Sequence, residues 1–277
     1  MTQTMTRILV CQKWVAPDTD ARGASHSPAD RAALEVALQM RDRLGDRSEV
    51  IALSLGGPGA QHGLRDSLAR GADRALWVSG PTDLRSDAVA AAIHAAVTTH
   101  LPEIGTPDWV ICGDYSIDRG SGSVPAFLAA LWGSQQALGL VHVTERSAIG
   151  AASGAAAIRR LDGGRRELLE ISAPAVLSVE GSVANLRRAT LARELAAAEM
   201  NIIEATAPSG PREMPSEITA YRPRARMLAA PAGLTALERV RSITEPATAT
   251  AHGETVELDP EEAAERILAA LRNWGYL

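Results

Sequence analysis

The sequence is poor in lysine. Of its 28 basic residues, Lys13 is the only lysine and all the others are arginines, which is typical of a GC-rich genome. Acidic residues outnumber basic ones, and the net charge is -5 at pH 7. Nucleic-acid-binding proteins usually carry a basic stripe, so this balance argues against a nucleic-acid partner.

Cysteine is scarce as well, with Cys11 and Cys112 alone, each at the end of a predicted buried strand. This is neither a disulfide framework nor a zinc cluster, and it is typical of a reducing compartment. The histidines show no metal-ligand spacing, so we expect no metal site.

No apolar run approaches the roughly 18 residues of a membrane span, and residues 1–7 do not resemble a signal peptide. We expect a cytoplasmic protein without direct membrane insertion.

What the first half does contain is a regular alternation of apolar runs and helical patterns. The predicted strands are 7–11, 50–55, 74–78 and 109–112; the predicted helices are 28–44, a segment ending at Arg70, 83–100 and 126–132. Short apolar runs between helices are typical of buried parallel strands. The order predicts an α/β fold in three layers, a parallel sheet with helices on both faces.

The predicted helix 28–44 has the clearest boundaries. Ser27 is a good N-cap, Pro28 suits the first helical position, and Asp30 places a carboxylate in the first turn. Gly45 is expected to end this helix, and Gly71 to cap the next one at its C-terminus.

Ligands of such sheets bind beyond the carboxyl ends of the strands, near the point where strand order reverses. That selects the loops after Cys11, Leu55 and Cys112. The third, 113–125, is acidic, rich in glycine and serine, and precedes a helix. Loop amides and a helix N-terminus make a cradle for phosphate. The loop has no Walker lysine and no G-x-G-x-x-G, so alone it is a weak signal.

The pattern changes after residue 132. Predicted strands at 137–143, 155–160, 165–171 and 175–179, with an Asp-Gly turn at 161–164, indicate a small antiparallel or mixed extension. A short helix is expected at 189–200.

The final third is predicted to be an arm rather than core. Four prolines (208, 211, 215 and 223) make 205–226 extended, and 245–254 reads as a loop. Asp259 is expected to cap a last helix with the apolar stripe Ala264, Ile267, Leu268 and Leu271. We therefore predict a nucleotide-binding α/β domain over 1–204 and a C-terminal arm and helix over 205–277 that pack on a partner subunit.

Five motifs follow one another along the chain. An apolar strand, Lys13 and a Pro-Asp pair occupy 8–18, and a Ser-Pro-Ala-Asp helix start occupies 27–30. An arginine-bearing helix runs into Gly-Ala-Asp-Arg over 65–74. A Gly-x-x-x-Ile-Asp segment with a small polar loop covers 113–124, and 157–177 runs from Ala-Ile-Arg-Arg through Leu-Asp-Gly-Gly to Pro-Ala-Val-Leu.

In this order the motifs resemble the β subunit of electron transfer flavoproteins, over roughly residues 7–204. The last is the most specific; Ser178 follows it where the family prefers Thr, Ala or Cys. The resemblance implies a Rossmann-like, adenine-nucleotide-hydrolase-like fold and a heterodimer with an α subunit that binds most of the FAD. It implies an electron carrier without substrate chemistry of its own, between flavin-dependent dehydrogenases and a membrane quinone-linked oxidoreductase.

The resemblance also implies a nucleotide in this subunit, either AMP or, as in the electron-bifurcating branch, a second FAD. The implied contacts are Cys11, Ser27, Pro28, Ala29, Asp30, Leu55, Gly113, Asp114, Tyr115, Ser116, Ile117, Asp118, Arg119, Gly120, Ser121, Gly122, Ser123 and Val124. They fall on the loops that topology selects independently.

Two departures from the family stand out. The phosphate loop has Ser123-Val124 where the family usually has Gln-Thr, so a hydroxyl donor is lost; Arg119 either faces a phosphate or is an exposed helix-end residue. The family docks on its dehydrogenase through a leucine in the motif Ala-Thr-Leu-Pro, which corresponds to Leu191 here, but Ala192 replaces the proline. Where the family then has a lysine-rich run, this chain has Ala-Ala-Ala-Glu at 196–199. Weaker electrostatic steering follows, which suggests a specialised dehydrogenase partner.

Two rivals share the core topology. One is a stand-alone adenine-nucleotide-binding regulator of the universal-stress type, disfavoured by the long arm and the 157–177 signature. The other is an adenylating ATP pyrophosphatase, which needs a Ser-Gly-Gly-x-Asp-Ser loop where this chain has 12–19.

Overall fold

The computed structural model describes residues 5–16, 23–146, 154–207, 231, 233–244 and 256–277. The chain forms two compact units, 1–214 and 215–277. We describe each unit by itself.

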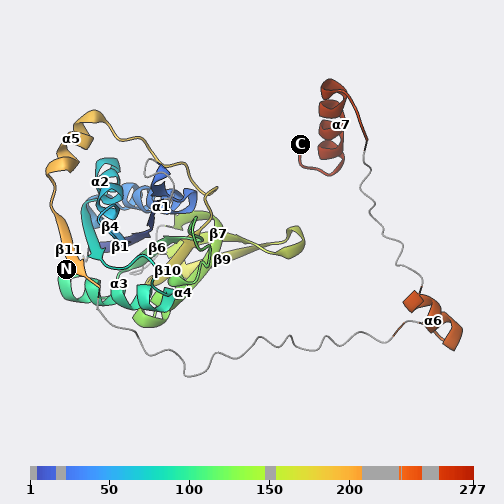
Figure 1. The fold of residues 1–277 in the computed structure, drawn as a ribbon, viewed down its shortest axis with the longest axis horizontal. Coiled ribbons are helices and arrows are strands. Elements are labelled where there is room, and N and C mark those ends of the chain that lie inside the picture. The colour runs from blue at the N-terminus through green and yellow to red at the C-terminus, as the bar shows by residue number, and fades with distance from the viewer. Residues whose placement is uncertain (1–4, 17–22, 147–153, 208–230, 232, 245–255) are drawn as a thin grey trace. The chain divides into compact units, whose positions relative to one another are not determined.

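A nine-stranded sheet organises the first unit, in the order β11-β5-β4-β1-β6-β10-β7-β8-β9 (Figure 1). Its strands are β1 (Thr6–Gln12), β4 (Ser48–Gly56), β5 (Arg74–Ser79), β6 (Trp109–Gly113), β7 (Gln135–Arg146), β8 (Gly154–Arg160), β9 (Arg166–Ser172), β10 (Ala175–Val179) and β11 (Ile202–Thr206). From β11 to β7 every pairing is parallel, and β8 and β9 add two antiparallel strands. The predicted α/β class with an antiparallel extension is confirmed.

Helices cover both faces of the sheet (Figure 1). α1 (Pro28–Leu44) and α2 (Ala60–Arg70) pack on one face, and α3 (Ser86–His100) and α4 (Val124–Trp132) on the other. Alternate residues of β1 divide between the two layers: Ile8 and Val10 face α1 and α2, whereas Leu9 and Cys11 face α3 and α4. This period of two on a fully covered strand explains why the buried strands read as continuous apolar runs.

The predicted helix boundaries hold best where a cap specifies them. The Ser27 hydroxyl accepts from the Asp30 amide at 2.9 Å, Pro28 is the first residue of α1, and Gly45 closes it. Gly71 caps α2 as expected. α3 begins at Ser86 rather than at residue 83, and α4 begins at Val124, two residues earlier than predicted.

Residues 205 and 206, which the sequence assigns to the arm, belong to the sheet. β11 pairs in parallel with β5, and Ala205 and Ala207 are buried. The proposed boundary at 204 therefore falls inside a strand. The four prolines from 208 to 223 and the loop 245–254 lie outside the described residues, as does the Pro-Asp pair at 17–18.

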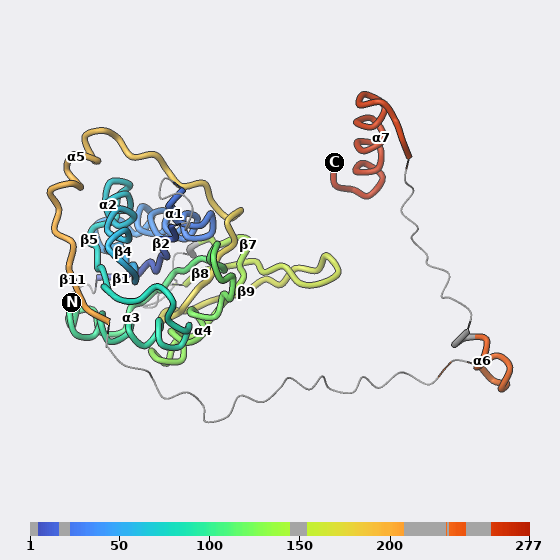
Figure 2. The backbone as a smooth tube through the Cα atoms, in the orientation of Figure 1, coloured from blue at the N-terminus to red at the C-terminus, as the bar shows by residue number. Residues whose placement is uncertain are grey.

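Smaller elements complete the first unit. β2 (Trp14–Val15) and β3 (Ser25–His26) form a separate antiparallel pair, and α5 (Leu191–Glu199) precedes β11. The β8–β9 hairpin extends from the body of the domain (Figure 2), with a 3-10 turn, Asp162–Gly164, at the predicted Asp-Gly site.

The second unit contains α6 (Ala236–Thr244), which the sequence did not suggest to us, and α7 (Pro260–Asn273), which it did. Asp259 caps α7 as predicted, accepting from the amides of Glu261 and Glu262 at 3.0 Å each. No residue of α7 is buried. Among the helices in the described ranges, none has the length and apolar content to span a bilayer.

Candidate functional site

A pocket opens at the carboxyl edge of the parallel sheet, beside the point where strand order reverses between β1 and β6. It encloses about 810 Å³ of space, open solvent at its mouth included. Its walls come from the ends of β1, β4 and β6, from the loop after β5, and from the N-terminal regions of α1, α3 and α4. A cavity therefore lies at the edge of the sheet where the topology predicts a ligand site.

Most of the predicted contact residues line this pocket. They are Cys11, Asp30, Leu55, Gly113, Tyr115, Ser116, Arg119, Ser121, Gly122, Ser123 and Val124. Seven others do not contribute to the lining: Ser27, Pro28, Ala29, Asp114, Ile117, Asp118 and Gly120. Ser27 is instead committed to capping α1, and its hydroxyl also donates to the Tyr115 carbonyl at 3.3 Å, which ties the helix start to the loop.

Asp30 lies where α1 approaches the end of β6. A Cβ on Gly113 would lie within 3.0 Å of backbone and side-chain atoms of Ala29 and Asp30, so only glycine permits this approach. Burial raises the pKa of Asp30 to about 7, against hydrogen bonds from Lys13, Ser27 and Gly113 that lower it. The carboxyl therefore sits close to its point of half-protonation at neutral pH.

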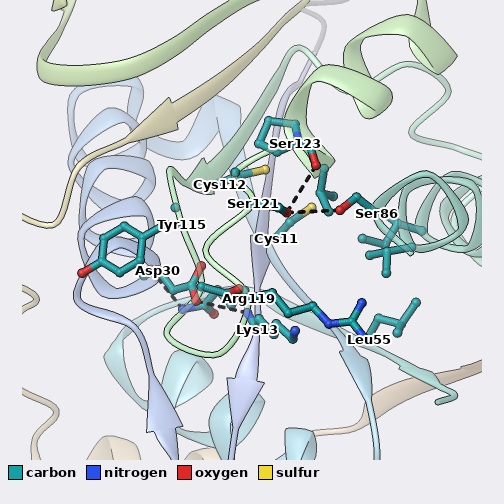
Figure 3. Close-up of a pocket in the computed structure, with 18 of the residues that line it drawn as sticks. Cys11, Lys13, Asp30, Leu55, Ser86, Cys112, Tyr115, Arg119, Ser121 and Ser123 are labelled. Carbon is teal, nitrogen blue, oxygen red and sulfur yellow. Dashed lines mark hydrogen bonds between the residues drawn. The ribbon is translucent and has the colours of Figure 1, made fainter. Parts of the chain in front are cut away.

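Three serine hydroxyls meet between the N-termini of α3 and α4. Ser86 and Ser121 are 3.2 Å apart at their oxygens, and the Ser123 hydroxyl donates to Ser121 at 3.2 Å (Figure 3). The loop reaches this position through Gly122, at φ +57°, where a Cβ would meet the Asp114 carbonyl oxygen at 2.4 Å. Two helix dipoles and three hydroxyls are suited to bind an anion.

Arg119 is exposed and lies in the loop before α4. Its guanidinium donates to the carbonyls of Asp83 and Leu84, both at 2.9 Å, in the loop before α3. It lines the pocket and links its two walls, so any contact with a phosphate competes with these bonds.

Lys13, the only lysine, stands at the pocket with its Nζ 2.5 Å from Asp118. Burial raises the pKa of Asp118, but hydrogen bonds from Lys13 and Ser116 prevail and lower it to about 2. Both side chains are about one-third exposed, so solvent screens the pair. The pair connects the end of β1 to the Gly-rich loop.

Part of the pocket wall comes from residues that were not predicted from the sequence. Residues Thr82, Leu84, Ser86, Val89 and Ile93 come from the loop after β5 and from α3. The topology could have predicted them, because β5 ends at the same edge of the sheet as β1, β4 and β6, and the loop after it therefore lies beside the other three loops. Gln12, Lys13, Cys112 and Pro125 also line the pocket without having been assigned to the site.

The two cysteines are free and line the pocket side by side. Cys11 of β1 and Cys112 of β6 are register partners in adjacent parallel strands. Within the described ranges, no group of three His, Cys, Asp or Glu side chains is arranged to hold a metal ion.

Leu191 lies away from the pocket, as the first residue of α5. The Thr190 hydroxyl caps this helix by accepting from the Arg193 amide at 3.3 Å. The Leu191 side chain is 72% exposed and Leu195, one turn later, is 64% exposed. α5 thus presents two leucines to solvent and buries only Ala197.

Comparison with known proteins gives consistent matches. A family model described as "Electron transfer flavoprotein domain" matches residues 18–209. The chain is 31% identical over 156 residues to "Electron transfer flavoprotein subunit beta" of Syntrophomonas wolfei, covering 56% of this chain and 57% of that protein. It is 33% identical over 181 residues to "Protein FixA" of Sinorhizobium fredii, covering 64% and 61%.

A third relative is "Acryloyl-CoA reductase electron transfer subunit gamma" of Anaerotignum propionicum, 26% identical over 186 residues. That match covers 62% of this chain and 66% of the relative. The chain therefore spans less than two thirds of the length of each of these relatives.

Proposed function

We propose that this chain, which belongs to the β-subunit branch of the electron transfer flavoprotein family, is one half of a heterodimeric electron carrier. Its partner would be an α subunit that binds most of the FAD. The dimer would carry electrons from a flavin-dependent dehydrogenase to a membrane quinone-linked oxidoreductase, and would work in the cytoplasm. The flavin would supply the redox chemistry, while this chain supplies binding and position.

The observation that carries the proposal is the pocket at the switch point of the sheet. We propose that it holds an adenine nucleotide, either AMP or a second FAD. The ends of three parallel strands, at Cys11, Leu55 and Gly113, form its floor. The mixture of apolar walls with a few polar groups suits a planar base and a charged phosphate.

The donor set fits a phosphate without the threonine that the family usually supplies. Val124 occupies the first position of α4 and has no hydroxyl. Ser86, at the start of α3, contacts Ser121 from the opposite wall and offers a donor in its place. We therefore assign the phosphate to the space between the two helix N-termini, with Ser86, Ser121 and Ser123 around it.

This assignment is tested by nucleotide binding to two variants. Ser86→Ala should weaken AMP binding about tenfold, because a hydrogen bond to a charged group is worth about 1.5–3 kcal/mol. Val124→Thr, which restores the missing hydroxyl, should tighten it. Ser182→Ala, an exposed serine outside the pocket lining, is the control. Unchanged affinity in Ser86→Ala would contradict this placement of the phosphate.

The heterodimer is tested by expressing the chain alone and together with the reading frame that neighbours its gene. A yellow 1:1 complex that forms only on co-expression is expected. Extraction of that complex would then separate AMP from FAD. A colourless, stable homodimer that binds ATP would overturn the proposal and favour the universal-stress-type regulator.

We further propose that Leu191 docks the dimer on its dehydrogenase. An apolar side chain 72% exposed at a capped helix start can fill a partner's pocket. Leu191→Ala should raise the KM for the dehydrogenase about tenfold or more, as for a buried interface anchor. Leu168→Ala is the matched control, because Leu168 of β9 is 73% exposed. Equal effects of the two changes would refute a specific role for Leu191.

The C-terminal unit is proposed to pack on the partner subunit. α7 carries apolar side chains on an otherwise charged helix, with Ile267 60% exposed and Leu268 41% exposed. Removing residues 256–277 should reduce the yield of the heterodimer without reducing nucleotide binding by the first unit. Normal heterodimer yield after this truncation would exclude the role.

A further inference from the structure

The floor of the pocket contains a pair of thiols that the proposed nucleotide site does not explain. Cys11 and Cys112 occupy partnered positions on β1 and β6 and belong to the same buried layer, so their side chains leave the sheet on the same face. The two thiol groups are close enough for Cys11 to raise the pKa of Cys112. Figure 3 shows both sulfur atoms in the pocket, near Ser121.

The backbone already meets the distance requirement of a disulfide. Neighbouring strands lie about 4.8 Å apart, and the Cα atoms of disulfide-bonded cysteines are usually about 4.4–6.8 Å apart. In a disulfide the two Cβ atoms lie about 3.8 Å apart, and partnered residues on one face of a sheet place their Cβ atoms next to each other. An S–S bond adds no atoms to the pocket, so it can form without unfolding the sheet.

We propose that Cys11 and Cys112 are an intrachain dithiol site that a small hydroperoxide oxidises to a disulfide in the pocket floor. Cys11 attacks the peroxide oxygen, forms a sulfenic acid and releases water. The sulfur of Cys112 then attacks the sulfur of Cys11, the S–O bond breaks, and the hydroxyl leaves as a second water with the thiol proton. In sum, two thiols and one hydrogen peroxide give one disulfide and two waters, and two electrons pass from sulfur to the peroxide.

The surroundings assign the order of the two cysteines. The hydrogen bond with Cys11, burial and the nearby Asp30 carboxylate raise the pKa of Cys112. Cys112 therefore keeps its proton at neutral pH, which makes it a poor nucleophile toward the peroxide. In the second step it loses this proton to the departing hydroxyl as its sulfur attacks Cys11. Both cysteines are buried from bulk solvent, at 8% and 4% exposure, and both line the pocket. Oxidants too large to enter the pocket should react slowly.

The first experiment uses the purified full chain without added nucleotide. Native protein is treated with hydrogen peroxide, quenched in acid, unfolded, and alkylated with iodoacetamide. We expect an intact mass lower by two hydrogens, no alkylation, and a proteolytic fragment that links the Cys11 and Cys112 peptides. Formation should be about tenfold or more faster than in the urea-denatured chain, where a loop of about 100 residues must close first.

Cys112→Ser is the matched variant, because it keeps Cys11 but removes the resolving thiol. It should give no intrachain disulfide, and with glutathione present it should give a mixed disulfide at Cys11. The wild-type measurement does not depend on the folding of this variant. Full alkylation of both native cysteines after peroxide, or a disulfide that forms no faster than in urea, would overturn the dithiol site.

A second arm repeats the oxidation with AMP, and this arm alone depends on the proposed function. A nucleotide over the floor should slow disulfide formation about tenfold or more at saturation, since the oxidant enters by the same pocket. AMP binding is measured separately by equilibrium dialysis. Absence of binding would count against the nucleotide site while leaving the disulfide result intact; binding without protection would show that the thiols are reached by another path.

Discussion

Helices α1 and α7 start with nearly the same chemistry and end in different surroundings. Each has a side-chain cap, Ser27 or Asp259, followed by proline at the first position and an acidic first turn. α1 buries ten of its residues against the sheet, whereas α7 buries none. The comparison teaches that capping determines where a helix begins, while burial of its apolar stripe depends on what the rest of the fold provides.

The largest difference in stability between the two helices is expected for a substitution at a buried leucine of α1. Leu34 is fully buried, so Leu34→Ala should lower the free energy of unfolding by about 2–5 kcal/mol through lost contacts and a cavity. Urea denaturation of the full chain measures this. A loss below about 1 kcal/mol would mean that the site collapses around the smaller side chain.

The acidic first turns of the two helices should respond differently to pH. The folded pKa of Asp30 is about 7 against an ordinary value of 3.8, so the folded state holds this proton more tightly. The associated stability is fully present below about pH 4 and is lost as pH rises through 7. We expect a decrease on the order of 4 kcal/mol in the free energy of unfolding across that window, because one pKa unit corresponds to about 1.4 kcal/mol.

Asp30→Asn should flatten this decrease, whereas Glu261→Gln in the exposed first turn of α7 should leave it unchanged. Chemical denaturation at several pH values provides the measurement. A slope that persists in Asp30→Asn would place its source in another group.

The caps themselves should differ in what they stabilise. Ser27→Ala removes the bond to the Asp30 amide and should cost about 1 kcal/mol of global stability, because α1 is part of the core. Asp259→Ala should instead fray α7 and leave the global transition in place. Amide hydrogen exchange separates the two outcomes; equal global losses would show that α7 unfolds together with the sheet.

The smallest loss of stability is expected from a leucine-to-alanine substitution in α7. Leu268→Ala removes an apolar side chain that is 41% exposed, so the isolated chain should lose less than about 0.5 kcal/mol. If α7 packs on the partner subunit, the heterodimer should dissociate more easily while the chain alone is unaffected. A large loss in the chain alone would show that Leu268 is buried within it.

Local signals predicted the parts of the fold that local chemistry determines. The boundaries of α1 follow from Ser27, Pro28 and Gly45, and the central strands follow from apolar runs too short for helices. β11 was missed because its pairing with β5 is a long-range choice, and the prolines that follow it suggested an arm. The contact of Ser86 with the Gly-rich loop was not predictable for the same reason, since its neighbour Ser121 is 35 residues away.

The position of Lys13 has a practical consequence. A chain with one lysine has one ε-ammonium group, and here that group marks the mouth of the pocket beside Asp118. Lysine labelled with ¹⁵N would therefore contribute a single side-chain resonance to the spectrum of the whole protein. Ligand entry, opening of the Gly-rich loop, or loss of the ion pair would each be visible at that one signal, without assignment of any other.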